Sequence, residues 1–279
     1  MKLTYDKVFD RFVLYVQNVG DLNVKLHRFL PDAATLKHVV LKRKASGWYV
    51  CLMLGCPDPL PVEPNGCPSV GADLGLLRLL TLSDGTPIDN PRWLRDALAE
   101  LRRVQRRLSR AVKGSRRRQE KRLLVAKLHE HIANIRRDFW HKLTHDLVHR
   151  YGLIALENLT LSFMTRNAHL SLSAHDAGLG VFRTLLCYKA VDAGSHLTFV
   201  NPANTSPVCS ACGKFVAKTL SVRVHACPHC HLVIDRDVNA AINSRDLALH
   251  SAWSGPSAAN VAALLGMRRL RSRPVYGSE

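Results

Sequence analysis

Four of the eight cysteines fall into two closely spaced pairs. Cys209 and Cys212 form the first C-x-x-C pair, and Cys227 and Cys230 form the second after an interval of 14 residues. This spacing suits two knuckles that bring four thiolates onto one tetrahedral Zn²⁺ ion, and four thiolates leave no coordination position open for a substrate water. The pattern therefore predicts a structural zinc module, placed at residues 201–234, whose folding depends on the metal.

Three histidines, His225, His229 and His231, lie among the predicted zinc ligands. An imidazole can take the place of a thiolate on zinc. Because four cysteines already complete the coordination shell, we expect these histidines to contact solvent or phosphate instead. The other four cysteines are expected to be scattered thiols: Cys51, Cys56, Cys67 and Cys187.

Three acidic residues lie at the ends of predicted elements. Asp73 lies in a predicted strand between two glycines, Glu157 ends a short apolar strand, and Asp237 begins a helix. Hydrolysis of a phosphodiester by two metal ions requires carboxylates from separate elements that converge on Mg²⁺ ions about 4 Å apart. Each acid alone also has a structural interpretation, because Asp next to Gly is common in turns and Asp early in a helix is a common cap.

The net charge identifies a class of partner. The 279 residues include 40 Lys and Arg against 22 Asp and Glu, and the sequence pI is about 10.0. A protein of this charge is attracted to polyanions by counterion release, so nucleic acid is the expected partner. No apolar stretch reaches the roughly 18 residues that a membrane-spanning helix needs. The first residues have no signal-peptide pattern, which predicts a cytoplasmic protein.

Much of the positive charge is concentrated in one segment. Apolar residues recur at helical spacing from Leu98 to Val112 and again from Leu124 to Leu147, which predicts two helices joined near Gly114. Residues 92–150 carry 18 Lys and Arg against 6 Asp and Glu, a net charge of +12. We therefore predict a basic helical hairpin that binds nucleic acid; the alternative is a charged helix pair that only faces solvent.

The flanking segments have other patterns. Residues 1–56 alternate apolar and polar positions between turn signals, which predicts a small β unit. Residues 57–69 are rich in Pro, Gly and Asn and are interpreted as a linker. A final helix is expected within 235–252, followed by a basic tail at 253–279.

Four motifs follow one another along the chain: Gly71-Ala72-Asp73-Leu74-Gly75, Ile154-Ala155-Leu156-Glu157-Asn158-Leu159, Thr205-Ser206-Pro207-x-Cys209-Ser210-x-Cys212-Gly213 and Asp235-Arg236-Asp237-Val238-Asn239-Ala240-Ala241. Asp176-Ala177-Gly178 and Tyr188-Lys189-Ala190 lie between them. In this order they resemble the motifs of TnpB proteins, the RNA-guided nucleases encoded by bacterial insertion sequences, and of their relatives, the type V CRISPR effectors. The resemblance covers roughly residues 70–245, and four ordered motifs are far more specific than one.

The resemblance implies an RNA-guided, Mg²⁺-dependent DNA endonuclease. Asp73, Glu157 and Asp237 would be its Mg²⁺ ligands and catalytic residues, and the four paired cysteines its Zn²⁺ ligands. Asp235 competes for the third acidic position, but the acid of the family stands two residues before an Asn, and Asn239 makes that position Asp237. The implied partners are a guide RNA from the transposon end and a target DNA, with the basic hairpin on phosphates.

The implied fold is α+β. A partial β wedge at 1–56 would precede an RNase H-like (RuvC-type) mixed sheet at 70–200, which is split by the basic hairpin at 92–150. The zinc ribbon and a final motif and helix at 235–252 would follow. In relatives a wedge barrel with a helical insert grips RNA, and residues 18–54 resemble the end of that barrel.

Two other functions are consistent with these residues. The first is a guide- or DNA-binding protein, such as a repressor or a decayed transposon relic, that does not cleave. The second is an unguided nuclease of the RuvC type. The presence of all three acids favours an enzyme over the first alternative, and the zinc ribbon disfavours the second, because resolvases lack such an insertion.

Overall fold

The structure, a computed structural model, describes residues 2–7, 9–27, 30–31, 34–55, 62–219 and 221–252. The chain divides into two compact units, Met1–Val62 with Asp96–Ile135 and Glu63–Arg95 with Arg136–Glu279. The predicted tail at 253–279 and residues 57–61 of the predicted linker lie outside the described residues. No helix in the described ranges is long and apolar enough to cross a lipid bilayer.

The β unit predicted at the start of the chain forms two small sheets. Three antiparallel strands make the first sheet and two make the second, a long ribbon. Their bounds are β1 Lys2–Asp6, β2 Arg11–Val16 and β3 Gly20–Val24, then β4 Thr35–Lys44 and β5 Gly47–Gly55. Within the same unit, the turn of the ribbon contacts the basic hairpin, because Ser46 N donates to Glu130 Oε2 at 3.0 Å.

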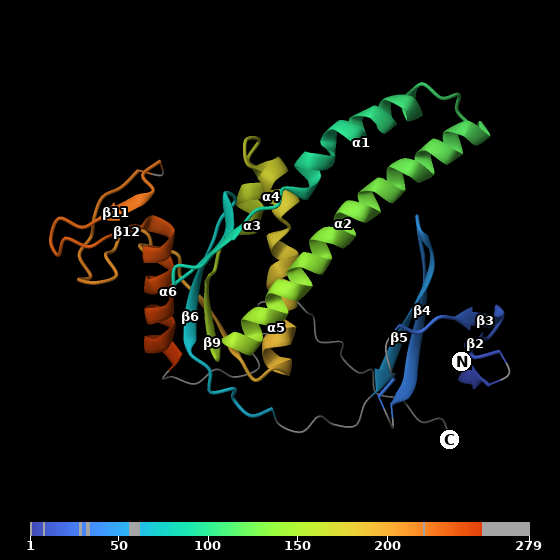
Figure 1. Ribbon diagram of the computed structural model, residues 1–279, viewed down its shortest axis with the longest axis horizontal. Helices are drawn as coiled ribbons and strands as arrows, with labels where there is room; N and C mark the ends of the chain where they lie inside the picture. The colour runs from blue at the N-terminus through green and yellow to red at the C-terminus, as the bar shows by residue number, and fades with distance from the viewer. Residues whose placement is uncertain are drawn as a thin grey trace, which may run out of the picture. The chain divides into compact units, whose positions relative to one another are not determined.

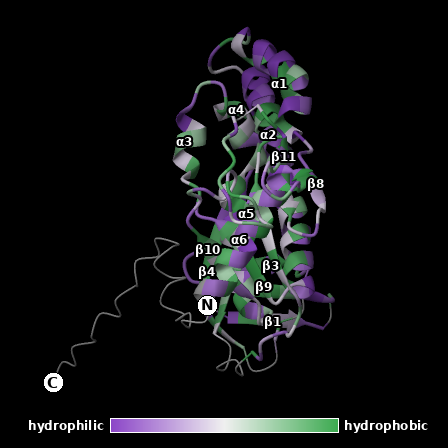
Figure 2. Cartoon of the chain, turned by 90° about the vertical axis from the view of Figure 1, so that its left-hand side faces the viewer, coloured by the Kyte–Doolittle hydropathy of each residue, from purple (hydrophilic) through white to green (hydrophobic). Residues whose placement is uncertain are grey.

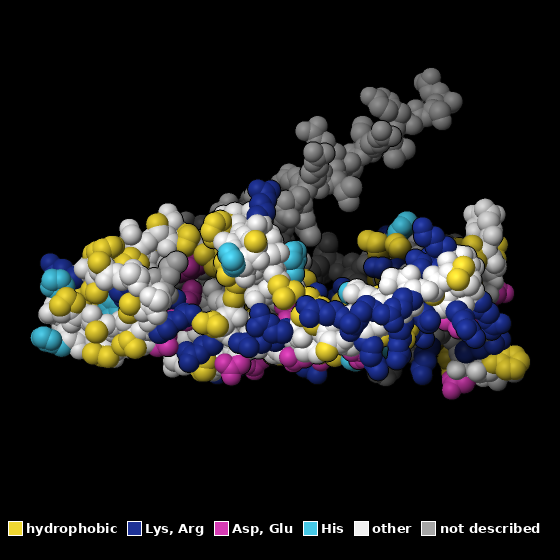
Figure 3. Space-filling view, turned by 90° about the horizontal axis from the view of Figure 1, so that it is seen from above, with side chains coloured by type: hydrophobic (Ala, Val, Ile, Leu, Met, Phe, Trp, Pro, Cys, Tyr) yellow, Lys and Arg dark blue, Asp and Glu magenta, His cyan; other side chains and the backbone are white. Residues whose placement is uncertain are grey.

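The two basic helices predicted from the apolar spacing are confirmed. They are α1, Trp93–Ser109, and α2, Arg116–Arg150, and the turn between them contains Gly114 at φ +83°. The Arg118 guanidinium donates to the carbonyl of Leu108, in the last turn of α1, at 3.0 Å and to that of Ala111, in the connecting turn, at 2.9 Å. These bonds join the start of α2 to the end of α1. Lys and Arg side chains gather over these helices (Figure 3).

The second unit is built on a mixed five-stranded sheet, as the α+β prediction requires. Strand order is β10-β9-β6-β7-β8, with β6, β9 and β10 parallel to one another and β7 and β8 antiparallel. The bounds are β6 Ser69–Leu74, β7 Arg78–Leu82, β8 Pro87–Asp89, β9 Leu153–Glu157 and β10 His196–Val200. The basic hairpin is inserted between β8 and β9, so it leaves the sheet and returns to it.

Helices cover both faces of this sheet (Figure 1). On one face, the end of α2 and helix α5, Leu179–Asp192, pack through a large apolar cluster that includes Trp140 and Phe182. On the other face lies α6, Arg236–Ala252, packed on β6 and β9. Colouring by hydropathy shows α5 and β9 as mainly apolar and α1 as mainly polar (Figure 2). Two short helices precede α5: α3, Leu161–Arg166, and α4, Ser171–Ala177.

Within this second unit, the Asp176-Ala177-Gly178 motif is hydrogen-bonded to the parts of α1 and α2 that lie next to the sheet. The Asp176 carboxylate accepts hydrogen bonds from the backbone N–H groups of Leu94 and Arg95 at 2.8 and 3.2 Å, so it satisfies the free donors in the first turn of α1. Trp140 Nε1 donates to the Ala177 carbonyl at 2.9 Å. The first turn of α1 and the C-terminal half of α2 are therefore both hydrogen-bonded to this one short segment.

Gly71 allows α6 to lie unusually close to β6. A Cβ atom added at Gly71 would stand 1.8 Å from the Ala241 carbonyl oxygen and 2.8 Å from the Arg245 nitrogen, both on the α6 backbone. No side chain can rotate to relieve such a clash, because the obstructing atoms are main chain. The glycine therefore sets the separation between the helix and the sheet.

We expect Gly71→Ala to lower the free energy of unfolding by at least about 2 kcal/mol, as overpacking against a fixed backbone does. Chemical denaturation measures the change. Gly180→Ala is the matched control, because its added Cβ would meet only Leu161 Cδ1 at 3.9 Å and replaces a glycine in a helix. Equal stability of the Gly71→Ala variant and the wild type would contradict the assigned contact.

Candidate active site and metal centre

The first two predicted acids lie on the sheet face that α6 covers. Strand residues alternate between faces. Val70 and Ala72 of β6 enter the apolar cluster on the α5 face, so Gly71 and Asp73 face α6. In β9, Ile154 and Leu156 belong to the same cluster, which leaves Glu157 on the α6 face. The parallel register pairs Ala72 with Leu156, and Asp73 and Glu157 are the next residues on each strand.

The third predicted acid approaches from the helix. Asp237 lies in the first turn of α6. Asp235 plays a different part, because its Oδ1 accepts from the backbone nitrogens of Asp237 and Val238 at 2.8 and 3.4 Å, and its Oδ2 pairs with Arg78 at 3.2 Å. Asp235 is therefore the N-cap of α6, and the Asp237 side chain takes no part in the cap.

The charges of the other two acids affect the ionisation of Asp73. Burial raises the pKa of Asp73 well above its usual value, and the negative charges of Glu157 and Asp237 raise it further, while Arg236 partly opposes them. A carboxylate is hard to ionise beside two others in a partly dry site. Asp73 would therefore be stabilised in its charged form by a cation bound between the three groups.

Glu157 is buried and has a single close hydroxyl partner. Its Oε1 lies 2.6 Å from Thr205 Oγ1, and only 6% of the residue is exposed. Burial raises the pKa of Glu157, the hydrogen bond from Thr205 lowers it, and the charge of Asp237 raises it. The dominance of burial shows that this carboxyl sits away from bulk water.

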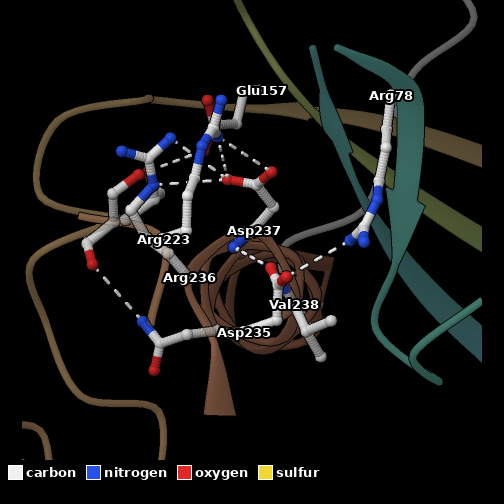
Figure 4. A network of polar contacts seen from close by, with 10 residues as sticks. Arg78, Glu157, Arg223, Asp235, Arg236, Asp237 and Val238 are labelled. Carbon is white, nitrogen blue, oxygen red and sulfur yellow. Dashed lines mark hydrogen bonds and ion pairs between the residues drawn. The ribbon is translucent and has the colours of Figure 1, made fainter. Parts of the chain in front are cut away.

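Two arginines hold the Asp237 carboxylate. Arg236 Nη2 lies 3.2 Å from Asp237 Oδ1, and Arg223 Nη1 lies 3.3 Å from Asp237 Oδ2. Figure 4 shows the guanidinium groups of Arg223 and Arg236 turned towards the carboxylate of Asp237. Within the described residues, only the four cysteines form a group of three or more potential ligand atoms that all lie within 4.8 Å of one another. The oxygens of the three carboxylates are therefore farther apart than this.

The four paired cysteines form one cluster. The sulfurs of Cys209 and Cys230 lie 3.6 Å apart, as do those of Cys212 and Cys227, and all four lie within 4.8 Å of one another. Thiolates about 2.3 Å from a tetrahedral zinc ion are separated by nearly this distance. The donor set and its spacing therefore fit one zinc ion and leave no position for a substrate.

The two knuckles have matching backbones. In each, the residue after the second cysteine has a positive φ, +70° at Gly213 and +61° at His231. In each, its N–H donates to the carbonyl of the first cysteine, at 2.9 and 3.0 Å. Strands β11, Val224–Ala226, and β12, Val233–Asp235, flank the second knuckle, and β12 leads directly into α6.

The histidines of the module behave differently from one another. His229 and His231 are exposed, as expected for residues that contact solvent. The expectation was wrong for His225, which is fully buried and whose Nδ1 contacts the Lys218 amine. The alternating pattern of the short strand β11 turns His225 inward, between two exposed neighbours.

Two asparagines whose contacts were not predicted from the sequence join the zinc module to α6. Asn239 is fully buried; its Nδ2 donates to the Val208 carbonyl at 2.8 Å and its Oδ1 accepts from Ser210 N at 3.0 Å. Asn243 Nδ2 donates to the carbonyls of Thr205 and Val208, both at 2.8 Å. Asn239 belongs to the fourth sequence motif, and the spacing of four residues places both asparagines on one face of the helix.

Two family models match this chain. OrfB_IS605, described as "Probable transposase", matches residues 52–168, and the TNB domain of Cas12f1-like proteins matches residues 180–244. The first match therefore contains Asp73 and Glu157, and the second contains the four cysteines and Asp237. The order of the matches follows the order of the elements in the sheet and the zinc module.

Curated relatives and a solved structure agree with these models. A candidate RNA-guided DNA endonuclease of Streptomyces pristinaespiralis is 36% identical over 80% of this chain and 55% of its own length. InsQ of Escherichia coli K12, of the same description, is 33% identical over 75% of this chain and 56% of its own. The chain thus spans about half the length of these relatives. The fold resembles a chain of a CRISPR-Cas12f ternary complex, with TM-score 0.51, 19% identity, and coverage of 76% of this chain and 46% of that one.

Removing the charge of Asp73 should stabilise the protein in Mg²⁺-free buffer. A raised pKa means that Asp73 keeps its proton in the folded state at a pH at which the unfolded state has released it. The free energy of unfolding therefore falls as pH rises above the usual pKa of Asp, and Asp73 does not lower it at a pH below that value. We expect Asp73→Asn to raise the melting temperature at pH 7 but not at about pH 3, where Asp is protonated in both states. A lower melting temperature at pH 7 would show that the three charges do not repel.

Replacing one thiolate should release the zinc. We expect about one zinc ion per chain in the wild type and little in Cys212→Ser, because three thiolates bind the ion far more weakly. Metal content by mass spectrometry measures this. Cys51→Ser, which removes an exposed thiol outside the cluster, is the control and should keep its zinc. Full zinc content in Cys212→Ser would exclude the module.

Proposed function

We propose that this chain, which belongs to the TnpB family of OrfB/IS605 proteins, cleaves DNA phosphodiesters at sites selected by a guide RNA. The observation that supports the proposal is the arrangement of three acids: Asp73 and Glu157 lie on neighbouring strands at one face of the mixed sheet, and Asp237 lies in the first turn of the helix that covers this face. Carboxylates brought together at a cost in electrostatic repulsion are typical of a site that binds divalent cations.

The sheet order supports an RNase H-like core. Three antiparallel strands, β6 to β8, are followed by two strands, β9 and β10, that run parallel to β6 on its other side. Two of the acids lie at corresponding ends of the adjacent parallel strands. We assign residues 70–200 and 235–252 to this nuclease core, 201–234 to the zinc ribbon and 1–56 to the wedge.

Each acid has a distinct role in the proposed site. Mg²⁺ held by such carboxylates activates water and neutralises charge on the phosphodiester oxygens. Asp73 and Asp237 would provide oxygens from opposite sides, and Glu157 would complete the set from the neighbouring strand. Arg223 and Arg236, which pair with Asp237, keep its carboxylate oriented when no cation is present.

The basic hairpin is the proposed nucleic-acid surface. Its net charge of +12 is exposed along two helices, and its base is tied to the nuclease core through Asp176. The named relatives are RNA-guided DNA endonucleases, and the structural neighbour is a ternary complex. We therefore propose a guide RNA and a target DNA as partners, bound mainly through phosphates.

We expect Asp73→Ala to abolish cleavage, with a loss of at least about a thousandfold in rate, because one of three cation ligands is lost. Its affinity for guide RNA and DNA, measured by filter binding, should change little because the basic hairpin is intact. A variant that still cleaves would remove Asp73 from the site.

Cleavage of a target plasmid tests the guided activity. The protein co-expressed with the RNA of its flanking transposon end is compared, with and without Mg²⁺, with protein purified free of RNA. Cleavage that needs both RNA and Mg²⁺ supports the proposal. Cleavage without RNA would instead assign an unguided nuclease, and RNA binding without cleavage would assign a binding protein.

A further inference from the structure

We propose that Thr205 is a positioning residue for Glu157, and that through Thr205 the zinc module fixes one carboxylate of the cation site; this inference rests on the proposed function. Thr205 Oγ1 lies 2.6 Å from Glu157 Oε1. Thr205 is 3% exposed and Glu157 is 6% exposed, so the pair is shielded from water. A hydrogen bond to a buried carboxylate is stronger and more directional than one at the surface.

The hydroxyl of Thr205 has one proton and two nearby acceptors. Glu157 Oε1 is at 2.6 Å, and the Pro202 carbonyl oxygen is at 3.0 Å. The shorter contact to the charged acceptor is favoured, so the proton points to the carboxylate. This bond occupies one lone pair of Oε1 and fixes the plane of the carboxyl group. The second oxygen, Oε2, is left to face the cation site.

The Thr205 backbone is itself held in place. Its carbonyl accepts from Asn243 Nδ2 at 2.8 Å. Three residues further on, the Val208 carbonyl accepts from both Asn239 and Asn243, each at 2.8 Å. Both asparagines belong to α6, the helix that begins beside Asp237. The same helix therefore carries one acid of the site and fixes the residue that orients another.

The held segment continues directly into the first zinc knuckle. Cys209 follows Val208 and is buried, and Ser210 N donates to Asn239 Oδ1 at 3.0 Å. Ligation of Cys209 and Cys212 fixes this knuckle, because a closed tetrahedral shell restrains all four sulfurs. The zinc module thus restrains the chain on the C-terminal side of Thr205, and α6 restrains Thr205 itself through the hydrogen bond from Asn243. A structural metal thereby acts on the geometry of the catalytic site without touching it.

Binding of Mn²⁺ by the whole, zinc-loaded protein tests this role. Free Mn²⁺ is followed by electron paramagnetic resonance, and the part of the uptake that Asp73→Asn removes is assigned to the acidic site. We expect Thr205→Val, which keeps the shape but not the hydroxyl, to weaken this uptake about tenfold or more, as loss of a partner to a metal ligand does. Thr205→Ser keeps the hydroxyl and should restore near-wild-type affinity.

A matched control is available in the same module. Thr219 is exposed, and its hydroxyl contacts only Ser221 among the described residues. Thr219→Val makes the same chemical change and should leave Mn²⁺ affinity unaltered. Zinc content and melting temperature are measured for every variant, and Thr205→Ala replaces Thr205→Val if the latter does not fold.

Failure of the inference and failure of the proposed function give different results. If the wild type shows no Mn²⁺ uptake that depends on Asp73, the cation site itself is wrong. If the wild type binds Mn²⁺ and the hydroxyl-free variants bind it equally well, the role of Thr205 is wrong and the proposed function stands. Thr205→Ser as weak as Thr205→Val would also overturn it, because the hydroxyl would not be the cause.

Discussion

Helix α6 approaches strand β6 so closely that one methyl group at Gly71 would collide with the helix backbone. Much of the second unit depends on this contact. It brings the first turn of α6, and with it Asp237, over the strand ends that carry Asp73 and Glu157. It also places the buried side of α6 against the segment that leads into the zinc knuckle. A single backbone approach therefore positions elements from three distant parts of the sequence.

Repulsion between the three carboxylates opposes this arrangement. Three carboxylates in a partly dry site repel one another, and the raised pKa of Asp73 is the direct sign of it. Arg223 and Arg236 offset part of the charge at Asp237, and Thr205 offsets part at Glu157. For Asp73, the charge of Arg236 and a backbone hydrogen bond from Leu74 lower the pKa only in part. Residues that are unfavourable for folding yet closely supported by their neighbours are expected where a site is built for a ligand.

Periodicity and spacing predicted the elements and the donor groups of the site. The short strands that contain Asp73 and Glu157, the helical repeats on either side of Gly114 and the two C-x-x-C pairs each depend on residues close in sequence, and all three appear in the structure. The acids' role as cation ligands stays a prediction. The capping of α1 by Asp176, the asparagine contacts and the burial of His225 were not predicted, because each depends on a tertiary contact between residues far apart or on which face of a short strand is covered.

The most direct test of the central claim is diffraction from crystals of the whole protein soaked in Mn²⁺, with data collected for anomalous scattering. We predict a strong peak bounded by the carboxylates of Asp73, Glu157 and Asp237, separate from the zinc peak at the four cysteines. A zinc peak alone, with no Mn²⁺ between the three acids and Asp237 still paired with its arginines, would contradict the proposal that these residues form a catalytic cation site.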